Sequence, residues 1–301
     1  MTNKLTRPPP SGGASTPDGI RRQVVERIKG FPSMPIFVSS IITLLNNPNT
    51  NVSQIAETVK FDPGMTANIL RLANSAEFGA HQRIHSLKEA IVRLGLKQLF
   101  QMVVAFGMAT KLVTPLKGYD LQPDELLSHS LWAALASEEL CKKLNLEMPD
   151  MLFTAGILHD LGKLLIDDFV ESHQADIRQI VQTENLSFED AESKVLGINH
   201  PEAGSELLTQ WHFPKTLVVV ARWHHRPEAA GEFRSIASIV HIADALSYAE
   251  GIGSGVDGFS YKLSDSAIAH LGLKTKTLEY VASQTLDKMR DLQDLLKQQG
   301  G

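Results

Sequence analysis

Apolar residues recur along most of this chain at intervals of three and four, which is the spacing of one face of an α-helix. Glycine, proline, asparagine and serine stand between the apolar segments, at positions typical of helix ends. No stretch alternates apolar and polar residues cleanly enough to predict a strand. The pattern therefore predicts an all-α, multi-helix protein with no significant sheet. The expected helices lie at residues 20–29, 35–45, 52–59, 64–74, 87–94, 97–112, 124–144, 151–169, 173–184, 187–196, 201–210, 214–223, 234–249, 264–271 and 276–298.

Composition divides the chain into three regions. Residues 1–19 are rich in Pro, Gly, Ser and Thr, and they have too little apolar surface to offset the entropy of ordering, so we expect a disordered tail. Residues 20–272 are expected to form one helical domain, with an N-terminal helical part at about 20–115 and a part that carries the candidate chemistry at about 116–272. Residues 273–301 hold a charged, periodic helix that either packs on the body or pairs with a second copy in a homodimer.

The overall composition excludes several classes of function. Hydrophobic residues make up 43% and charged residues 21% of the 301 residues, as in ordinary globular proteins. The net charge of −5 argues against binding to nucleic acid duplexes, which requires a basic surface. No apolar run approaches the roughly 20 residues that a membrane span needs. A single cysteine, Cys141, excludes a disulfide framework and a cysteine-built zinc site, and it suits a reducing compartment, so we expect a cytoplasmic protein.

The most informative segment reads AGILHDLGKLLI, in which His159 and Asp160 lie within an almost continuous apolar helix. An apolar environment implies burial, and a buried carboxylate without a partner costs several kcal/mol, so a cation should face Asp160. Lys163 is one candidate, because it lies three residues further on the same helical face. A metal ion is the other candidate, and this segment alone leaves both open.

Other histidines and acids stand where a metal site could recruit them. The chain has eleven histidines, and His129 shares a predicted helical face with Glu125, four residues before it. His200 stands at a predicted helix start, and Asp244 is a second carboxylate within an apolar helix.

The pair His224-His225 ends another apolar helix. Any one of these residues could be a helix cap or a satisfied core residue, and we interpret the remaining histidines in that way: His81, His85, His173, His212, His241 and His270. The joint pattern is difficult to explain as separate caps, and it predicts a metal site. The candidate ligands are Glu125, His129, His159, Asp160, His200, His224, His225 and Asp244.

The sum of the formal charges of the ligands favours two ions in this site. Five neutral imidazoles and two carboxylates carry −2, and two divalent cations carry +4, which leaves +2 to attract a hydroxide and a phosphate oxygen. Imidazole and carboxylate ligands suit iron, manganese, zinc, nickel or cobalt, and they do not favour calcium. Lys163 and Arg226 could then bind phosphate oxygens, and Asp160 with Lys163 are the candidate catalytic residues.

The order His129, His159-Asp160, Asp244 resembles the defining pattern of the HD superfamily of metal-dependent phosphohydrolases. Within it, the chain resembles bacterial HDOD signalling domains. The resemblance rests on FPSMP at 31–35, FDPGMTANILRLANSA at 61–76 and IHSLKEAIVRLG at 84–95, and it covers roughly residues 25–250. It implies an all-α fold and a role in signal transduction, although many HDOD domains have lost metal ligands and are regarded as non-catalytic.

The additional histidines at 200, 224 and 225 resemble the ligand set of HD-GYP phosphodiesterases, which bind two or three metals, often iron, and cleave cyclic di-GMP. This resemblance implies that iron is the first metal to expect and that Asp160 bridges two metals. It also implies that His225 and Glu125 match positions used by the larger clusters. After the histidine pair, however, the sequence RPEAAGEF lacks the Gly-Tyr-Pro loop of that family. Activity on cyclic di-GMP therefore does not follow from the resemblance.

Three functions fit the sequence. The first is a metal-bearing regulatory module that signals through protein partners. The second is a metal-dependent phosphohydrolase that acts on a phosphate-containing small molecule, such as a nucleotide or a cyclic dinucleotide. The third is a metal-free helical scaffold. The sequence slightly favours a regulatory protein that retains its metal site, with hydrolysis within its reach.

Overall fold

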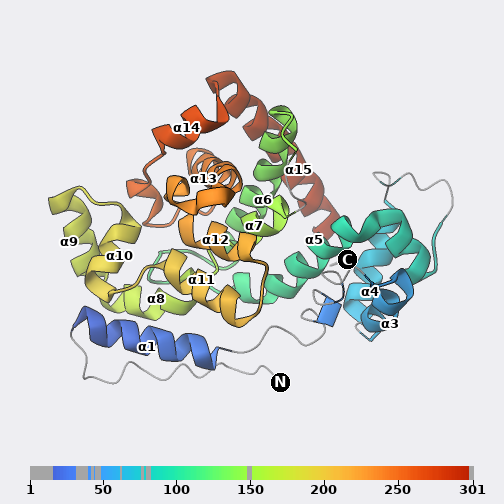
Figure 1. The fold of residues 1–301 in the computed structure, drawn as a ribbon, viewed down its shortest axis with the longest axis horizontal. Coiled ribbons are helices and arrows are strands. Elements are labelled where there is room, and N and C mark those ends of the chain that lie inside the picture. Colours follow the sequence, from blue (N-terminus) through green and yellow to red (C-terminus); the bar gives the residue numbers. More distant parts are fainter. Residues whose placement is uncertain are drawn as a thin grey trace.

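The computed structural model describes residues 16–31, 40–41, 44, 49–61, 63–75, 78, 83–147 and 151–297, and over these residues it is helical (Figure 1). The β pairing among them is limited to an isolated bridge between Leu116 and Leu121, which confirms the all-α prediction. Residues 1–15 of the predicted tail, most of the helix predicted at 35–45, and His81 lie outside the described residues. Among the described helices, none is both long enough and apolar enough to cross a membrane.

The helices follow the predicted order closely. Their bounds are α1 Pro17–Gly30, α3 Val52–Val59, α4 Pro63–Ala73, α5 Leu87–Leu112, α6 Glu125–Lys143, α7 Leu152–Leu158, α8 Lys163–Ser172, α9 Gln174–Glu184, α10 Phe188–Leu196, α11 His200–Gln210, α12 Lys215–Trp223, α13 Arg234–Ala249, α14 Asp265–Leu271 and α15 Thr275–Lys297. Two short 3₁₀ helices, η2 Pro227–Phe233 and η3 Gly258–Ser260, were not expected from the sequence.

Local capping explains where the first helices begin. Thr16 caps α1 by accepting a hydrogen bond from Gly19 N, and Pro17 takes the first helical position, so α1 starts earlier than the apolar pattern predicted. Asn51 caps α3 in a capping box with Gln54, which fixes the start of the helix at Val52 as predicted.

The helix predicted at 151–169 is in fact two helices, α7 and α8, with a turn at 159–162 between them. Gly162 explains the close packing of this turn on α11, because a Cβ at this position would overlap the carbonyl oxygen of His200. The prediction of a single helix was therefore wrong. The break places His159 and Asp160 in a tight turn between two helix ends, instead of along the face of a continuous helix.

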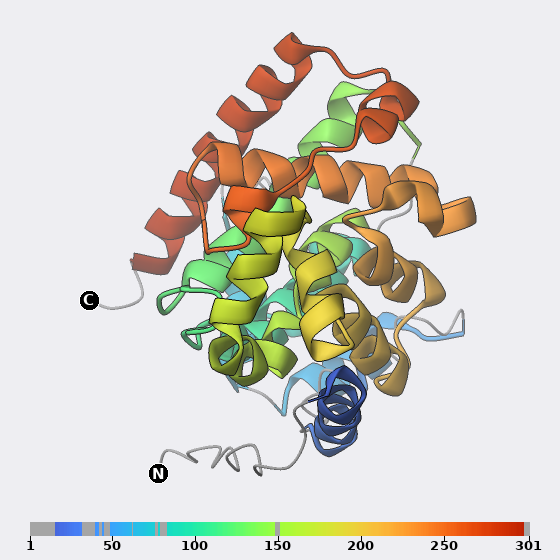
Figure 2. The same ribbon diagram turned by 90° about the vertical axis from the view of Figure 1, so that its left-hand side faces the viewer.

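The helices form two groups that meet along α5 (Figure 1). Helices α3 and α4 pack against the first part of α5, which bends at Gly95, where φ is 77°. The second group surrounds α6, α7 and α13, and α15 packs along α6, where Lys288 Nζ lies 2.7 Å from Glu139 Oε1 (Figure 2). The C-terminal helix therefore packs on the body, which was one of its two expected arrangements.

Helix α1 belongs spatially to the second group, although the sequence suggested that it joins the N-terminal helical part. It packs against α8, α10 and α11 through its buried residues Ile20, Val24 and Ile28. Arg27 adds an ion pair to Asp168, at 3.0 Å. The first helix thus packs against the helical group that carries the candidate site.

Candidate metal centre

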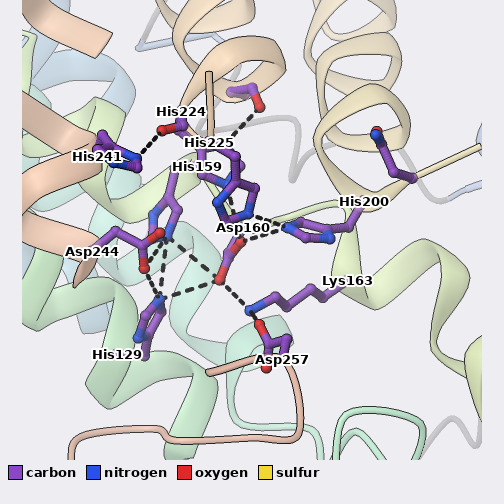
Figure 3. Close-up of polar contacts among 12 residues, drawn as sticks. His129, His159, Asp160, Lys163, His200, His224, His225, His241, Asp244 and Asp257 are labelled. Atoms are coloured by element: carbon purple, nitrogen blue, oxygen red, sulfur yellow. Dashed lines mark hydrogen bonds and ion pairs between the residues drawn. The ribbon is translucent and has the colours of Figure 1, made fainter. Parts of the chain in front are cut away.

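Five segments of the second helical group bring the predicted ligands together (Figure 3). Helix α6 carries His129, and the turn after α7 carries His159 and Asp160. The remaining ligands come from the start of α11, the end of α12 and the middle of α13, and they are His200, His224, His225 and Asp244. All except His225 are almost completely buried.

The ligand atoms form two groups on either side of Asp160. In the first ligand group, made of His129, His159 and Asp244, the Nε2 atom of His129 lies 3.1 Å from Asp244 Oδ1 and 3.2 Å from His159 Nε2. Asp160 Oδ2 faces this group, at 3.2 Å from His129 Nε2 and 3.4 Å from His159 Nε2.

The second ligand group consists of His200, His224 and His225, together with the other oxygen of Asp160. Asp160 Oδ1 lies 3.4 Å from His200 Nε2 and 3.6 Å from His224 Nε2. His225 Nε2 lies 3.0 Å from His200 Nε2. The two oxygens of a single carboxylate therefore face two separate sets of imidazoles.

These separations match the spacing of donors around a common ion. Two ligands bound at about 2.1 Å are about 3.0 Å apart at an octahedral angle and about 3.4 Å apart at a tetrahedral angle. The distances given above, 3.0–3.6 Å, lie close to this range, and all ligand atoms of each group lie within 4.8 Å of one another. Each group is thus the right size to hold one ion.

Backbone carbonyls fix the tautomers of two histidines. His159 Nδ1 donates to Gly156 O at 2.7 Å, and His224 Nδ1 donates to Ala221 O at 2.8 Å. Because Nδ1 holds the proton of the neutral ring, the lone pair is on Nε2, which is the atom that faces Asp160. Both partners lie three residues earlier in the chain, so the local helix geometry sets these orientations.

Side chains fix two more histidines. His200 Nδ1 donates to Glu192 Oε2 at 2.8 Å, and the same oxygen accepts from the backbone N–H of His200 at 2.9 Å. His129 Nδ1 lies 2.9 Å from Ser247 Oγ, whose own proton goes to a backbone carbonyl, so the histidine is the donor in this pair. Glu192 and Ser247 act as outer partners of the site, and sequence analysis did not identify either of them.

The buried carboxylates carry more negative charge than the hydrogen bonds around them satisfy. Neither oxygen of Asp244 accepts a hydrogen bond, and no hydrogen bond of normal geometry reaches either oxygen of Asp160. Burial by itself would raise the pKa of Asp160, but the charges of Lys163 and His159 outweigh burial and hold this pKa well below its usual range. A site of this kind requires positive charge at its centre.

Protons supply part of that charge when no cation is bound. Burial lowers the pKa of His159, yet the adjacent Asp160 and Asp244 carboxylates prevail and raise it to about 10. In the second ligand group, burial lowers the pKa of His224 to about 4, so this imidazole is neutral and ready to act as a ligand. The donor set, its spacing and its unsatisfied carboxylates all fit a pair of transition-metal ions.

Lys163 makes one contact that the sequence suggested, with Asp160, and one that it did not, with Asp257. We expected it to be free to bind a phosphate oxygen, but its Nζ lies 2.6 Å from Asp160 Oδ2 and 2.6 Å from Asp257 Oδ2. Asp257 belongs to a glycine-rich stretch after α13, where small residues allow the backbone to approach the site closely. The glycines of this stretch are the feature of the sequence that could have indicated Asp257 as a site residue.

Two predicted site residues lie apart from the ligand groups. The carboxylate of Glu125 accepts a hydrogen bond from Gln122 N at 2.7 Å, at the start of α6. Arg226 is half exposed and forms an ion pair with Asp190. His241, which we interpreted as a structural residue, is buried outside both groups, and its Nδ1 donates to the backbone carbonyl of His224 at 2.8 Å.

Comparisons with known proteins agree with this architecture. Residues 31–227 match the HDOD domain family. Over 89% of this chain and 90% of the other, the fold is similar to that of an HDOD domain protein of unknown function from Geobacter sulfurreducens, with a TM-score of 0.61 and 24% identity. A protein from Shewanella amazonensis SB2B, described as a "Putative phosphohydrolase", gives a TM-score of 0.64 with 24% identity over 88% of this chain and 93% of the other.

A third structure, described as a "Putative signal transduction protein" from Marinobacter aquaeolei VT8, gives a TM-score of 0.65 with 19% identity over 93% of this chain and 65% of the other. A sequence relative, an uncharacterized protein of Treponema pallidum, is 24% identical over 73% of this chain. The match spans 43% of the length of that relative. The family match covers well over half of the chain, and the chain therefore belongs to the HDOD domain family.

Proposed function

We propose that this HDOD protein is a metal-dependent phosphohydrolase of a signalling system, with two transition-metal ions in its centre. The observation that carries the proposal is the position of Asp160, whose Oδ2 faces the first ligand group and whose Oδ1 faces the second. When bound, two close divalent ions supply a nucleophile at neutral pH and stabilise charge on a transferring phosphoryl group. Imidazole and carboxylate donors suit iron, manganese and related metals.

The residues of the chain have separate roles in this proposal. Asp160 would contribute one oxygen to each ion, and the outer partners of the histidines keep each Nε2 lone pair directed inwards. Lys163 places a fixed positive charge beside Asp160, where it can neutralise an anionic substrate. The burial of the site excludes bulk water and strengthens each of these electrostatic interactions.

Similar proteins support the reaction class in part. One structure of similar fold is described as a "Putative phosphohydrolase", and another as a "Putative signal transduction protein". The ligand set also resembles that of HD-GYP phosphodiesterases, but the chain lacks their Gly-Tyr-Pro loop. We therefore propose a phosphate-containing small molecule, such as a nucleotide or a cyclic dinucleotide, as the substrate class.

A regulatory module without turnover is the second candidate. It is favoured by the closure of the site, because Lys163 and the ligands other than His225 are almost completely buried. In this alternative the ions stabilise one conformation that protein partners recognise.

Turnover measurements distinguish the two candidates. The purified protein would be loaded with Mn²⁺ or Fe²⁺ and assayed against a panel of phosphomonoesters, nucleotides and cyclic dinucleotides. Asp160→Asn should lower turnover by about 100-fold or more and lower the metal content, because it removes the charge shared by both groups. Asp176→Asn, on the exposed face of α9, is the matched control and should leave both unchanged. Two bound ions without any turnover that depends on Asp160 would favour the regulatory module.

A further inference from the structure

The segment that follows α13 reaches the end of the Lys163 side chain through Asp257 (Figure 3). It reads EGIGSGVDG at residues 250–258, and we call it the cover segment. Its backbone presses onto the site, because a Cβ at Gly253 would lie only 2.6 Å from His129 Cβ. Gly251 and Gly253 have φ values of 71° and 61°, which other residues rarely adopt. The sequence is thus suited to closing this side of the metal centre.

Asp257 ties the cover segment to the site. Its Oδ2 accepts hydrogen bonds from Lys163 Nζ at 2.6 Å and from Tyr248 OH at 2.9 Å. The Asp257 side chain is only 5% exposed, and its Oδ1 accepts no hydrogen bond. One of the two oxygens of this buried carboxylate therefore lacks a hydrogen bond, and this costs free energy in the closed arrangement.

The partners of Asp257 are suited to a phosphate oxygen as well as to a carboxylate oxygen. An ammonium group and a phenol both donate to anionic oxygens, and neither distinguishes carboxylate from phosphate by shape. Lys163 Nζ is also 2.6 Å from Asp160 Oδ2, so the anion held at this point lies beside the carboxylate that faces both ligand groups. A phosphate ester bound there would have its phosphorus close to the metal centre.

Besides Asp257, the half-buried side chains of Ile252 and Val256 hold the cover segment on the core, together with two backbone hydrogen bonds. Val256 N donates to Tyr119 O at 2.9 Å, and Ile252 N donates to Ser247 O at 2.9 Å. Phe259, immediately after the segment, is 92% exposed, so its ring contributes no apolar packing there. The segment has no helical hydrogen-bond ladder, it is rich in glycine, and residues 250, 251 and 254 are exposed, so it opens more easily than the helices around it.

Building on the proposed function, we propose that Asp257 occupies the position of a substrate phosphate on Lys163, and that a phosphate-bearing ligand displaces it and opens the cover segment. Asp257 is then an internal competitor that keeps the centre closed until an anion replaces it. The ligand class is a phosphate ester, whose charged oxygens take over the contacts with Lys163 and Tyr248.

Amide hydrogen exchange on the metal-free, full-length protein tests whether Asp257 keeps the cover segment closed, and it relies on neither metal nor turnover. Asp257→Asn should speed exchange of the Val256 amide by about tenfold, because a neutral amide binds the ammonium more weakly. Ser254→Ala, at an exposed position of the same segment, should exchange like the wild type. Equal exchange in all three proteins would overturn the proposal.

Titration of the Mn²⁺-loaded protein with inorganic phosphate tests the exchange of anions. By calorimetry, Asp257→Asn should bind phosphate about tenfold more tightly than the wild type, since no carboxylate has to be displaced. Phosphate should also speed exchange of the Val256 amide in the wild type. Phosphate binding that leaves this amide protected, or no phosphate binding in either protein, would overturn the proposal. The proposed function is judged separately, by turnover that depends on Asp160.

Discussion

Glu192 offers a sharp test of the metal centre, because it touches the second ligand group through His200 alone. The side chain is completely buried and accepts from Tyr119 OH at 2.6 Å and from His200 Nδ1 at 2.8 Å. Glu192→Gln keeps the shape and a carbonyl oxygen for His200, but it removes the negative charge that makes this imidazole a stronger ligand. Changes to such outer partners weaken metal binding by about 10–100-fold, or about 1.4–2.8 kcal/mol.

The assay is a competition titration of metal-free protein with Mn²⁺ or Zn²⁺ against a fluorescent chelator. Glu192→Gln should weaken one of two binding steps by about 10–100-fold and leave the other unchanged, since the first ligand group makes no contact with Glu192. Glu184→Gln, the same substitution at an exposed residue that pairs with Lys194, should leave both steps unchanged. Two unchanged steps in Glu192→Gln, or equal weakening of both in a protein that is still folded, would refute the division into two groups.

Further predictions concern pH, packing and the first helix. Because nearby carboxylates raise the pKa of His159 to about 10, metal binding must expel its proton, so calorimetry should show proton release and an affinity that rises with pH. Gly162→Ala should destabilise the fold by about 3 kcal/mol in chemical denaturation, whereas Gly30→Ala, with open space around it, should change stability by less than about 1 kcal/mol. Burial raises the pKa of Glu202, but the hydrogen bond from Arg21 outweighs burial and holds this pKa below its ordinary value of 4.5. The ion pair therefore stabilises the fold above pH 4.5, and this stabilisation is lost as the pH falls through the lowered pKa. Glu202→Gln should therefore cost about 1 kcal/mol at pH 7, and the difference from the wild type should shrink in acid.

The helical architecture could be predicted from the sequence because it depends on local patterns. Apolar periodicity located α6, α9, α10, α12 and α13 to within one or two residues. The break between α7 and α8 could not be predicted in this way, since apolar residues with helical spacing continue on both sides of the polar residues at 159, 160 and 163. It depends on the contact between Gly162 and the backbone of α11, and such a contact appears only when the helices are packed.

The candidate ligands could be named because charged and imidazole groups in apolar helices need partners. This argument identified His159, Asp160 and Asp244 directly, and the structure brings them within a few ångströms of one another. The same argument could not reveal Glu192, because an acid on an amphipathic helix is normally exposed. It also could not show that Lys163 is held by Asp257, which is 94 residues away in the chain.

The central claim is that Asp160 lies between two metal ions, and anomalous diffraction from crystals of the Mn²⁺- or Fe²⁺-loaded protein tests it most directly. The account predicts two anomalous peaks about 3.5–4 Å apart, one among His129, His159 and Asp244 and the other among His200, His224 and His225, with Asp160 bound to both. A loaded crystal with no peak at these histidines, or with a single peak that Asp160 does not contact, would contradict it.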